Sequence, residues 1–486
     1  MEAFDFIVIG AGLSGIDAAY RLKTQMPQCS FTILEARDKI GGTWSFFKFP
    51  GLRSDSMLTN FGFPWRPWLQ KRDMANAALI LEYIESAAKD ERIDTKIQFN
   101  HSVKGANWSS QDQLWTLRVE HNGHDKLLRT SFVINCSGYY DYKKPLQTSI
   151  PGIENFGGAV AHPQFWPDNL DYTGKKVVIV GSGATAVTML PVLAETAAHV
   201  TMLQRSPSYV FSIPSVSKTG NLIKEYLPGW LAHPINWWRC FLSEQLFVNF
   251  NLYFPTAARK LHMGLMKKQL PEHVPVDVHF NPRYDPMDQR LCLCPDGDFF
   301  KALHQKNCHI VTDTIDTVLT DGILTTSGQK LDADIIVTAT GLHVALLSGI
   351  IPTVDDKPID IGNSYAWRGT MLTGLPNMGS ITGYTTASWT LGADASIKLL
   401  ISVYKYMKKI GATSAVPVFD GDGSTVSKPV VGHSSTYFID ARSRLPRITD
   451  SSPWYGRISP VYDTWQLWFG SLTKGMRYTV PSKKDI

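Results

Sequence analysis

The chain has 486 residues, of which 44% are hydrophobic and 19% are charged, and its formal net charge is +5. This composition excludes disordered and fibrous chains and indicates a globular protein of roughly two to four domains. The basic excess is small and is not gathered into a run, so we expect no nucleic-acid partner.

Cysteine content and apolar runs narrow the class further. Six cysteines in so long a chain are too few for a disulfide framework, and their spacing lacks the paired pattern of a zinc site. We therefore expect unlinked thiols and no metal site. The first residues lack the basic and apolar regions of a signal peptide, and no uncharged apolar run is long enough to cross a membrane. These features predict a cytoplasmic protein without a transmembrane segment and leave its oligomeric state undetermined.

The chain opens on a pattern of strand, helix and strand. An apolar run over residues 4–9 has the character of a fully buried strand, a helical pattern follows to about residue 26, and residues 31–34 form a second apolar run. A parallel pair of strands joined by a crossover helix is a βαβ unit.

The turn between the first strand and the helix carries the pattern G-x-G-x-x-G, as Gly10, Gly12 and Gly15, and Glu35 follows twenty residues later. The first glycine permits a tight turn, the second lets the backbone approach a pyrophosphate, and the third lets the helix pack on the strand. The helix N-terminus attracts phosphate, and Glu35 can accept hydrogen bonds from ribose hydroxyls. We therefore predict a dinucleotide site here.

The following segments are less regular. Residues 41–68 are rich in glycine, proline and aromatic residues and indicate a long loop, and residues 75–90 have a helical pattern. Residues 98–135 are typical of short strands with turns, the last of them a short buried strand over residues 132–135.

A second βαβ unit starts near residue 174. Its strand ends in another glycine-rich turn, formed by Gly181, Gly183, Ala184, Thr185 and Ala186, with alanine in place of the third glycine. The acid expected about twenty residues later is missing, and Arg205 and Ser206 stand there instead. Because an arginine can pair with a 2′-phosphate that a carboxylate would repel, we predict that this second site binds NADPH.

The remainder divides into three parts. Residues 220–270 are helical in pattern and dense in aromatic side chains, which form either a lipophilic pocket or a buried helical core. Residues 309–340 return to strands, and residues 371–410 pass from a glycine-rich region into a helix. The last 75 or so residues carry no pattern that we could interpret.

One acid-type and one arginine-type fingerprint in a single chain predict FAD together with NADPH. This combination excludes simple dehydrogenases, which need one nucleotide. Disulfide reductases that use both need a redox-active cysteine pair near the first helix. Cys29 is unpaired there, which favours a flavin monooxygenase.

Longer motifs resemble one family. Residues 156–167, FGGAVAHPQFWP, are similar to the signature F-x-G-x-x-x-H-x-x-x-W-[PD] of Baeyer–Villiger monooxygenases, which are class B flavoprotein monooxygenases. The sequence GGTW at residues 41–44, FPG at residues 49–51 and Asp55 fit a second pattern of this family. The sequences RSDS at residues 53–56 and DQRL at residues 288–291 are most similar to the ethionamide monooxygenase-like subgroup.

The resemblance implies a mechanism, in which NADPH reduces FAD, the reduced flavin takes up O2 as a C4a-peroxyflavin, and this species attacks a ketone to give an ester or lactone. It implies that Arg290 is the catalytic cation and that Asp55 orients it. An arginine suits a peroxide anion because it provides a charge without acting as an acid. His162 would hold the linker between the domains.

The residues assigned to the cofactors complete the site prediction. For FAD they are Gly10, Gly12, Gly15, Glu35, Gly42, Trp44, Asp55 and Val103. Trp44 and Trp389 line the flavin region or belong to the aromatic core. Many relatives carry lysine immediately before the catalytic arginine, where this chain has Gln289, so its preference for NADPH could be weaker than usual.

The predicted fold is therefore α/β, with two Rossmann-like dinucleotide-binding domains, for FAD and for NADPH, and a helical insertion. We assign residues 1–145 and 344–486 to the FAD domain, 146–215 and 275–343 to the NADPH domain, and 216–274 to the insertion. The predicted activity is the Baeyer–Villiger oxidation of a lipophilic ketone with O2. The alternatives are a sulfur or nitrogen heteroatom oxygenase with the same cofactors, whose substrate could be a sulfide, and an NADPH oxidase or flavin-binding redox module.

Overall fold

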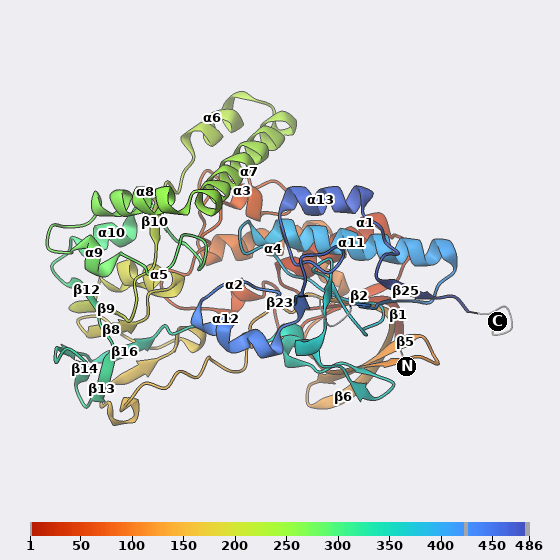
Figure 1. Cartoon of the computed structure of the whole chain (residues 1–486), viewed down its shortest axis with the longest axis horizontal. Helices are drawn as coiled ribbons and strands as arrows, with labels where there is room; N and C mark the ends of the chain where they lie inside the picture. The colour runs from red at the N-terminus through yellow and green to blue at the C-terminus, as the bar shows by residue number, and fades with distance from the viewer. Residues whose placement is uncertain (1, 422–425, 482–486) are drawn as a thin grey trace.

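The computed structural model describes residues 2–421 and 426–481. Its two large sheets lie at opposite ends of an elongated molecule (Figure 1). The first sheet has the order β18-β17-β4-β5-β6-β1-β2-β3, and β21, β20 and β19 branch from β6. Its strands are β1 (Glu2–Ile9), β2 (Phe31–Leu34), β3 (Ile97–Gln98), β4 (His101–Ser109), β5 (Leu114–His121), β6 (His124–Asn135), β17 (Thr353–Val354), β18 (Lys357–Pro358), β19 (Ala366–Trp367), β20 (Met371–Leu372) and β21 (Met378–Ser380).

Strand β1 shows why this sheet is buried on both faces. Phe6 and Val8 pack with the helices on one face, whereas Ile7 and Ile9 pack with the antiparallel strands and the β19–β21 region on the other. Successive side chains of a strand point to opposite faces, so a strand covered on both sides is apolar throughout. The covering helices are α1 (Leu13–Gln25), α4 (Ala77–Asp90) and α11 (Trp389–Ile410).

The second sheet is parallel and has the order β12-β9-β8-β16-β7. Val177 and Ile179 of β8 face helices α5 and α10, and Val178 faces a small antiparallel sheet on the opposite side. The elements are β7 (Ala159–Ala161), β8 (Lys176–Val180), α5 (Ala184–Leu193), β9 (His199–Gln204), α10 (Asp298–Leu303), β12 (Cys308–Thr312), β16 (Ile335–Thr338), and the small sheet β13 (Ile315–Leu319), β14 (Gly322–Thr325) and β15 (Lys330–Asp332).

Shorter elements join these two parts. Strands β10 (Val210–Ile213) and β11 (Cys292–Pro295) form a parallel pair. Helices α2 (Thr43–Phe46), α3 (Leu58–Phe61) and α12 (Thr436–Ala441) lie near the centre, and α9 (Val276–His279) lies in the second half (Figure 1). The C-terminal part adds β22 (Ser414–Pro417), β23 (Lys428–Pro429), β24 (Arg447–Ile448), α13 (Pro460–Phe469) and β25 (Met476–Thr479).

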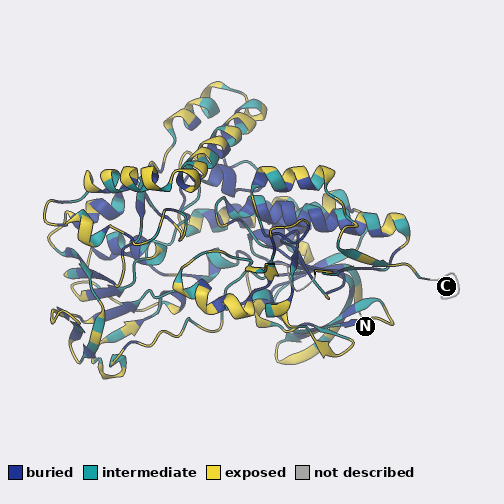
Figure 2. Cartoon of the chain, in the orientation of Figure 1, coloured by how far each residue is buried: buried dark blue, intermediate teal, exposed yellow. Residues whose placement is uncertain are grey.

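The aromatic segment forms three helices, α6 (Lys218–Tyr226), α7 (Gly229–Tyr253) and α8 (Pro255–Lys267). Helix α6 and the adjoining part of α7 project from the body, whereas α8 lies along the second half (Figure 1). Its aromatic side chains do not all line a pocket, and they do not all belong to a buried core. Trp230 is 78% exposed and Tyr253 is 75% exposed, whereas Phe241 is buried. Figure 2 shows long exposed stripes on these helices, so much of their apolar surface faces solvent.

The structure tests two further predictions, one on residues 132–135 and one on the cysteines. Residues 132–135 are the end of the twelve-residue strand β6, and not a separate short strand, because its parallel pairing with β1 begins at Leu128, where the strand still pairs with β5, and runs to Asn135. All six cysteines are free, as predicted. In the part of the chain that the structure describes, no helix is both long enough and apolar enough to cross a membrane.

A buried carboxyl group lies where α1 packs against α11. Asp17 is fully buried and its Oδ1 accepts a hydrogen bond of 2.9 Å from Trp65 Nε1. Burial, followed by the nearby Asp394 carboxylate, raises the pKa of Asp17 from 3.8 to about 8. A group whose pKa is raised by folding stabilises the protein fully below its unfolded pKa and loses this contribution as the pH rises through the folded pKa.

We therefore expect Asp17→Asn to flatten the loss of stability between pH 4 and pH 8. The amide oxygen can still accept from Trp65, and it needs no buried negative charge. Above pH 8 the variant should be more stable than the wild type by a few kcal/mol, and in acid the two should be similar. Thermal melting across this pH range measures the effect, with the exposed Asp38→Asn as control. A variant that melts below the wild type at alkaline pH would contradict the prediction.

Candidate active site between two nucleotide-binding motifs

A single cavity of about 1000 Å³ connects the two halves of the molecule. Its wall includes Gly10, Glu35 and Asp55 from the first half, Thr185 and Arg290 from the second, and side chains of α7. Pockets for small ligands commonly have volumes of roughly 300–1,000 Å³. This cavity therefore has room for an extended ligand such as a dinucleotide.

The first glycine-rich turn is built so that only glycine fits. A Cβ atom on Gly10, whose φ is +100°, would lie 2.8 Å from the carbonyl oxygen of Cys136. A Cβ atom on Gly15 would lie 1.9 Å from the carbonyl oxygen of Gly10, so helix and strand are in direct contact. Gly12 precedes α1 without a side-chain cap and faces Gly42 across the turn. The first N–H groups of α1 thus remain available to an anion at the cavity wall.

Glu35 is 5% exposed and lies at the end of β2. Its Oε2 accepts a hydrogen bond of 2.8 Å from the Ala11 backbone N–H, and its Oε1 accepts one of 3.0 Å from that of Arg37. The carboxylate therefore holds the glycine-rich turn against β2. Each carboxylate oxygen can accept a further hydrogen bond, so this arrangement is compatible with ribose hydroxyls.

Gly42, Trp44, Val103 and Trp389 all border the cavity. Trp389 begins α11, donates a hydrogen bond of 3.0 Å from Nε1 to Ser14 Oγ, and stacks on Tyr139 with ring centroids 5.0 Å apart. The tryptophans thus belong to the cavity wall and also pack against neighbouring aromatic side chains.

The second glycine-rich turn repeats the geometry of the first. A Cβ atom on Gly181, at φ +140°, would lie 2.3 Å from the Ala339 carbonyl oxygen. Gly183 precedes α5 without a side-chain cap. Ala184 and Thr185 border the cavity.

The other residues predicted at the nucleotide sites lie outside the cavity wall, namely Gly15, Gly181, Gly183, Ala186, Arg205 and Ser206. Arg205 and Ser206 are exposed and follow β9. Ser182 Oγ donates a hydrogen bond of 2.9 Å to the Ser206 carbonyl oxygen, and Arg205 Nη2 donates one of 3.4 Å to Thr436 of α12. These contacts put Arg205 beside the second glycine-rich turn.

Asp55 and Arg290, 235 positions apart, form an ion pair at the cavity wall. Arg290 Nε donates to Asp55 Oδ2 over 2.8 Å, and Nη2 donates to Oδ1 over 2.5 Å. The Asp55 carboxylate holds the pKa of Arg290 well above its ordinary value. The arginine side chain is 52% exposed, so its remaining N–H groups can reach a ligand.

Sequence analysis missed several cavity residues. Glu244 of α7 borders the cavity, and burial raises its pKa above the ordinary value. A lone acid within an apolar helical stretch was a signal that could have singled it out. The Tyr139 and Tyr140 hydroxyls lie 2.6 Å apart in the same wall. Arg53 also borders the cavity and pairs with Asp298.

His162 lies between the two halves, as the interpretation of a linker residue requires. Its Nδ1 accepts a hydrogen bond of 3.1 Å from the Gln164 backbone N–H, and the Gln164 side chain donates one of 2.6 Å to the Asp141 carbonyl oxygen. Burial lowers the pKa of His162. These contacts favour a structural role.

Known proteins with similar sequences share nearly the whole chain. The family model described as flavin-binding monooxygenase-like matches residues 4–223. The FAD-containing monooxygenase EthA of Mycolicibacterium smegmatis is 43% identical over 454 residues, which cover 93% of this chain and 92% of that protein. The probable FAD-binding monooxygenase AlmA of Acinetobacter baylyi is 38% identical over 454 residues, covering 93% and 91%.

Solved structures share the fold. An oxidized steroid monooxygenase bound to NADP has a TM-score of 0.76 at 18% identity and covers 99% of this chain and 100% of that one. An OTEMO complex with FAD and NADP has a TM-score of 0.71 at 20% identity and covers 98% and 99%. These likenesses, together with the two sheets, confirm the predicted α/β fold with two dinucleotide-binding domains.

Proposed function

Because the chain belongs to the family of flavin-binding, class B flavoprotein monooxygenases, we propose that it uses FAD, NADPH and O2 to convert lipophilic ketones into esters or lactones. The observation that carries this proposal is the Arg290–Asp55 ion pair at the cavity wall. It joins a cation from one half of the molecule to a carboxylate from the other, beside both nucleotide motifs.

The two motifs divide the cofactors between them. FAD would bind along Gly10, Gly12 and Gly15, with Glu35 at its ribose, and its other contacts would come from Gly42, Trp44, Asp55 and Val103. The bare N-terminus of α1 and the close contact of Gly12 with Gly42 support this assignment. The flavin supplies the reaction with O2.

NADPH would bind at the second motif. Its pyrophosphate would face the N-terminus of α5 at Gly181, Gly183, Ala184, Thr185 and Ala186, and Arg205 with Ser206 would receive the 2′-phosphate. The exposed guanidinium of Arg205, held beside this turn by Thr436, supports the preference for NADPH over NADH.

Arg290 would stabilise the negative charge that develops when an oxygen nucleophile adds to the ketone carbonyl. Its pKa lies far above neutrality, so it cannot quench the nucleophile with a proton. Phe247 and Val248 of α7 border the same cavity, which supports a lipophilic substrate.

Product analysis separates this proposal from the alternatives. The purified holoenzyme would be given NADPH or NADH, O2, and either an aromatic or long-chain ketone or the sulfide of the same shape. An ester formed in proportion to NADPH consumed supports the proposal. Oxidation of the sulfide alone would point to a heteroatom oxygenase, and hydrogen peroxide without product would point to an oxidase. Arg205→Met should raise KM for NADPH about tenfold or more and leave KM for NADH nearly unchanged.

A further inference from the structure

A second ion pair lies beside Arg290–Asp55. Arg53 donates to the Asp298 carboxylate through both terminal nitrogens, the longer contact being 3.2 Å from Nη2 to Oδ1. The Arg53 side chain is 12% exposed and that of Asp298 is 30% exposed, so this pair is more shielded from water than Arg290, which is 52% exposed. An ion pair of this bidentate kind is stronger and more directional than a surface pair.

The two pairs have opposite polarity. The first half contributes the cation Arg53 to one pair and the anion Asp55 to the other. The second half contributes their partners, the anion Asp298 and the cation Arg290. A relative shift that moved either arginine towards the other pair would bring like charges together. The crossed arrangement therefore favours one orientation of the two halves.

Both sides of this contact are held firmly within their own halves. Between Arg53 and Asp55, the Ser54 backbone N–H donates a hydrogen bond of 3.0 Å to the Ala75 carbonyl oxygen. Asp298 begins α10, which packs with α5 in the core of the second half. Strand β11 connects Arg290 to Asp298, and its Cys292 and Cys294 are buried. The four charges thus sit on two rigid segments.

Resting on the proposed function, we propose that Arg53 and Asp298 form a positioning pair that fixes the two nucleotide-binding halves against each other, so that Arg290 stays on Asp55 at the cavity wall. Arg290 is half exposed, and among the residues that the structure describes its acidic partner is Asp55, which belongs to the other half of the chain. The position of Arg290 therefore depends on the orientation of the two halves. Misplacement of a catalytic group by about 1 Å can cost on the order of 100-fold in rate.

A double-mutant cycle tests this pair, with Arg53→Gln, Asp298→Asn and the combined variant. The matched control is the cycle of Lys48→Gln and Asp168→Asn, because that ion pair also joins the two halves but is 54% and 76% exposed. Two measurements are made on each holoenzyme: hydrogen exchange of residues 52–56 and 288–294, and the ester formed per NADPH consumed.

Each single variant should speed exchange in both segments and lower the ester formed per NADPH about tenfold. The combined variant should be no worse than either single one, since both remove the same interaction. The proposal would be overturned if the losses of the two single variants added up in the combined variant. It would also be overturned if the variants changed hydrogen exchange and the ester formed per NADPH no more than those of the control cycle do. If the wild type forms no ester, the proposed function fails, but the exchange data still decide whether the pair holds the halves together.

Discussion

Replacing Arg290 with methionine is expected to lower ketone oxygenation by about 100- to 1,000-fold while NADPH still reduces the flavin. The expected loss equals that of removing one preorganised charge from a site where negative charge develops. Methionine is unbranched and carries no charge, and the half-exposed position of Arg290 tolerates the change without a buried cavity.

Arg290→Lys should fail almost as severely. Lysine keeps the charge but cannot make the two parallel hydrogen bonds that Arg290 makes to Asp55, and its ammonium group can donate a proton. Both variants should continue to consume NADPH and to release hydrogen peroxide.

Stopped-flow measurement of flavin reduction, combined with quantification of ester and hydrogen peroxide, separates these effects. Arg444→Met is a suitable control because Arg444 forms an exposed ion pair with Asp440 on the surface. If either variant at Arg290 kept more than about a tenth of the wild-type ester yield, the arginine would not be the cation that stabilises the reacting oxygen.

The parts of the site that were predictable are local in sequence. A buried strand, a glycine-rich turn and a helix occupy a short stretch, and the constraint on Gly10 and Gly15 arises from the turn itself. The same is true of the turn at Gly181. Arg290 and Asp55 could be paired in advance only through a family resemblance, since 235 positions separate them.

Contacts between distant segments were not predictable. Arg53 and Asp298 are 245 positions apart, and the local sequence around neither of them indicates that they pair. The helical pattern of residues 220–270 gave the correct helices but not their orientation, because an apolar stripe packs against whatever the tertiary structure provides. On α7, Phe247 lines the cavity, whereas Trp230 is exposed to solvent.

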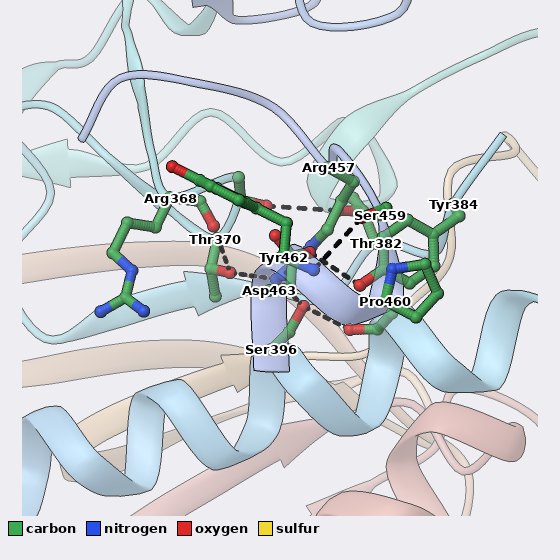
Figure 3. Close-up of polar contacts among 12 residues, drawn as sticks. Arg368, Thr370, Thr382, Tyr384, Ser396, Arg457, Ser459, Pro460, Tyr462 and Asp463 are labelled. Atoms are coloured by element: carbon green, nitrogen blue, oxygen red, sulfur yellow. Dashed lines mark hydrogen bonds and ion pairs between the residues drawn. The ribbon is translucent and has the colours of Figure 1, made fainter. Parts of the chain in front are cut away.

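The C-terminal part also makes contacts with distant segments that could not be predicted. Its sequence gave no interpretable pattern, yet α13 carries Asp463, which pairs with Arg457 over 2.9 Å beside α11. Figure 3 shows Arg457 between Thr370, Ser396 and Asp463, with the Tyr384 hydroxyl on the same carboxylate. These contacts bring four separate segments together, which no local pattern encodes.

This buried network leads to the second large expected effect, the loss of stability on Asp463→Asn. Asp463 is 4% exposed, and Arg457 and Arg368 are the cations around it. Burial lowers the pKa of Arg368, and its Nη1 has no hydrogen-bond partner among the described residues. Without the Asp463 charge, the Arg457 guanidinium would lose its buried carboxylate partner, and Arg368 would lose a nearby negative charge.

Breaking a buried ion pair by removing one partner typically costs about 3–5 kcal/mol. We expect a loss of this size for Asp463→Asn, although the amide oxygen can still accept the Tyr384 hydrogen bond of 2.7 Å. Because Arg457 and Tyr384 border the cavity, the variant should also release FAD more readily. Thermal melting with and without added FAD, and hydrogen exchange of residues 454–470, measure the two effects.

The combined variant Arg457→Met with Asp463→Asn distinguishes charge from packing. It removes the uncompensated cation, so it should recover part of the stability lost in Asp463→Asn. A single variant that melts within about 1 °C of the wild type would mean that solvent or a ligand already neutralises the arginines. A combined variant less stable than the single one would mean that Arg457 stabilises this region mainly through Thr370 and Ser396, and not through the carboxylate of α13.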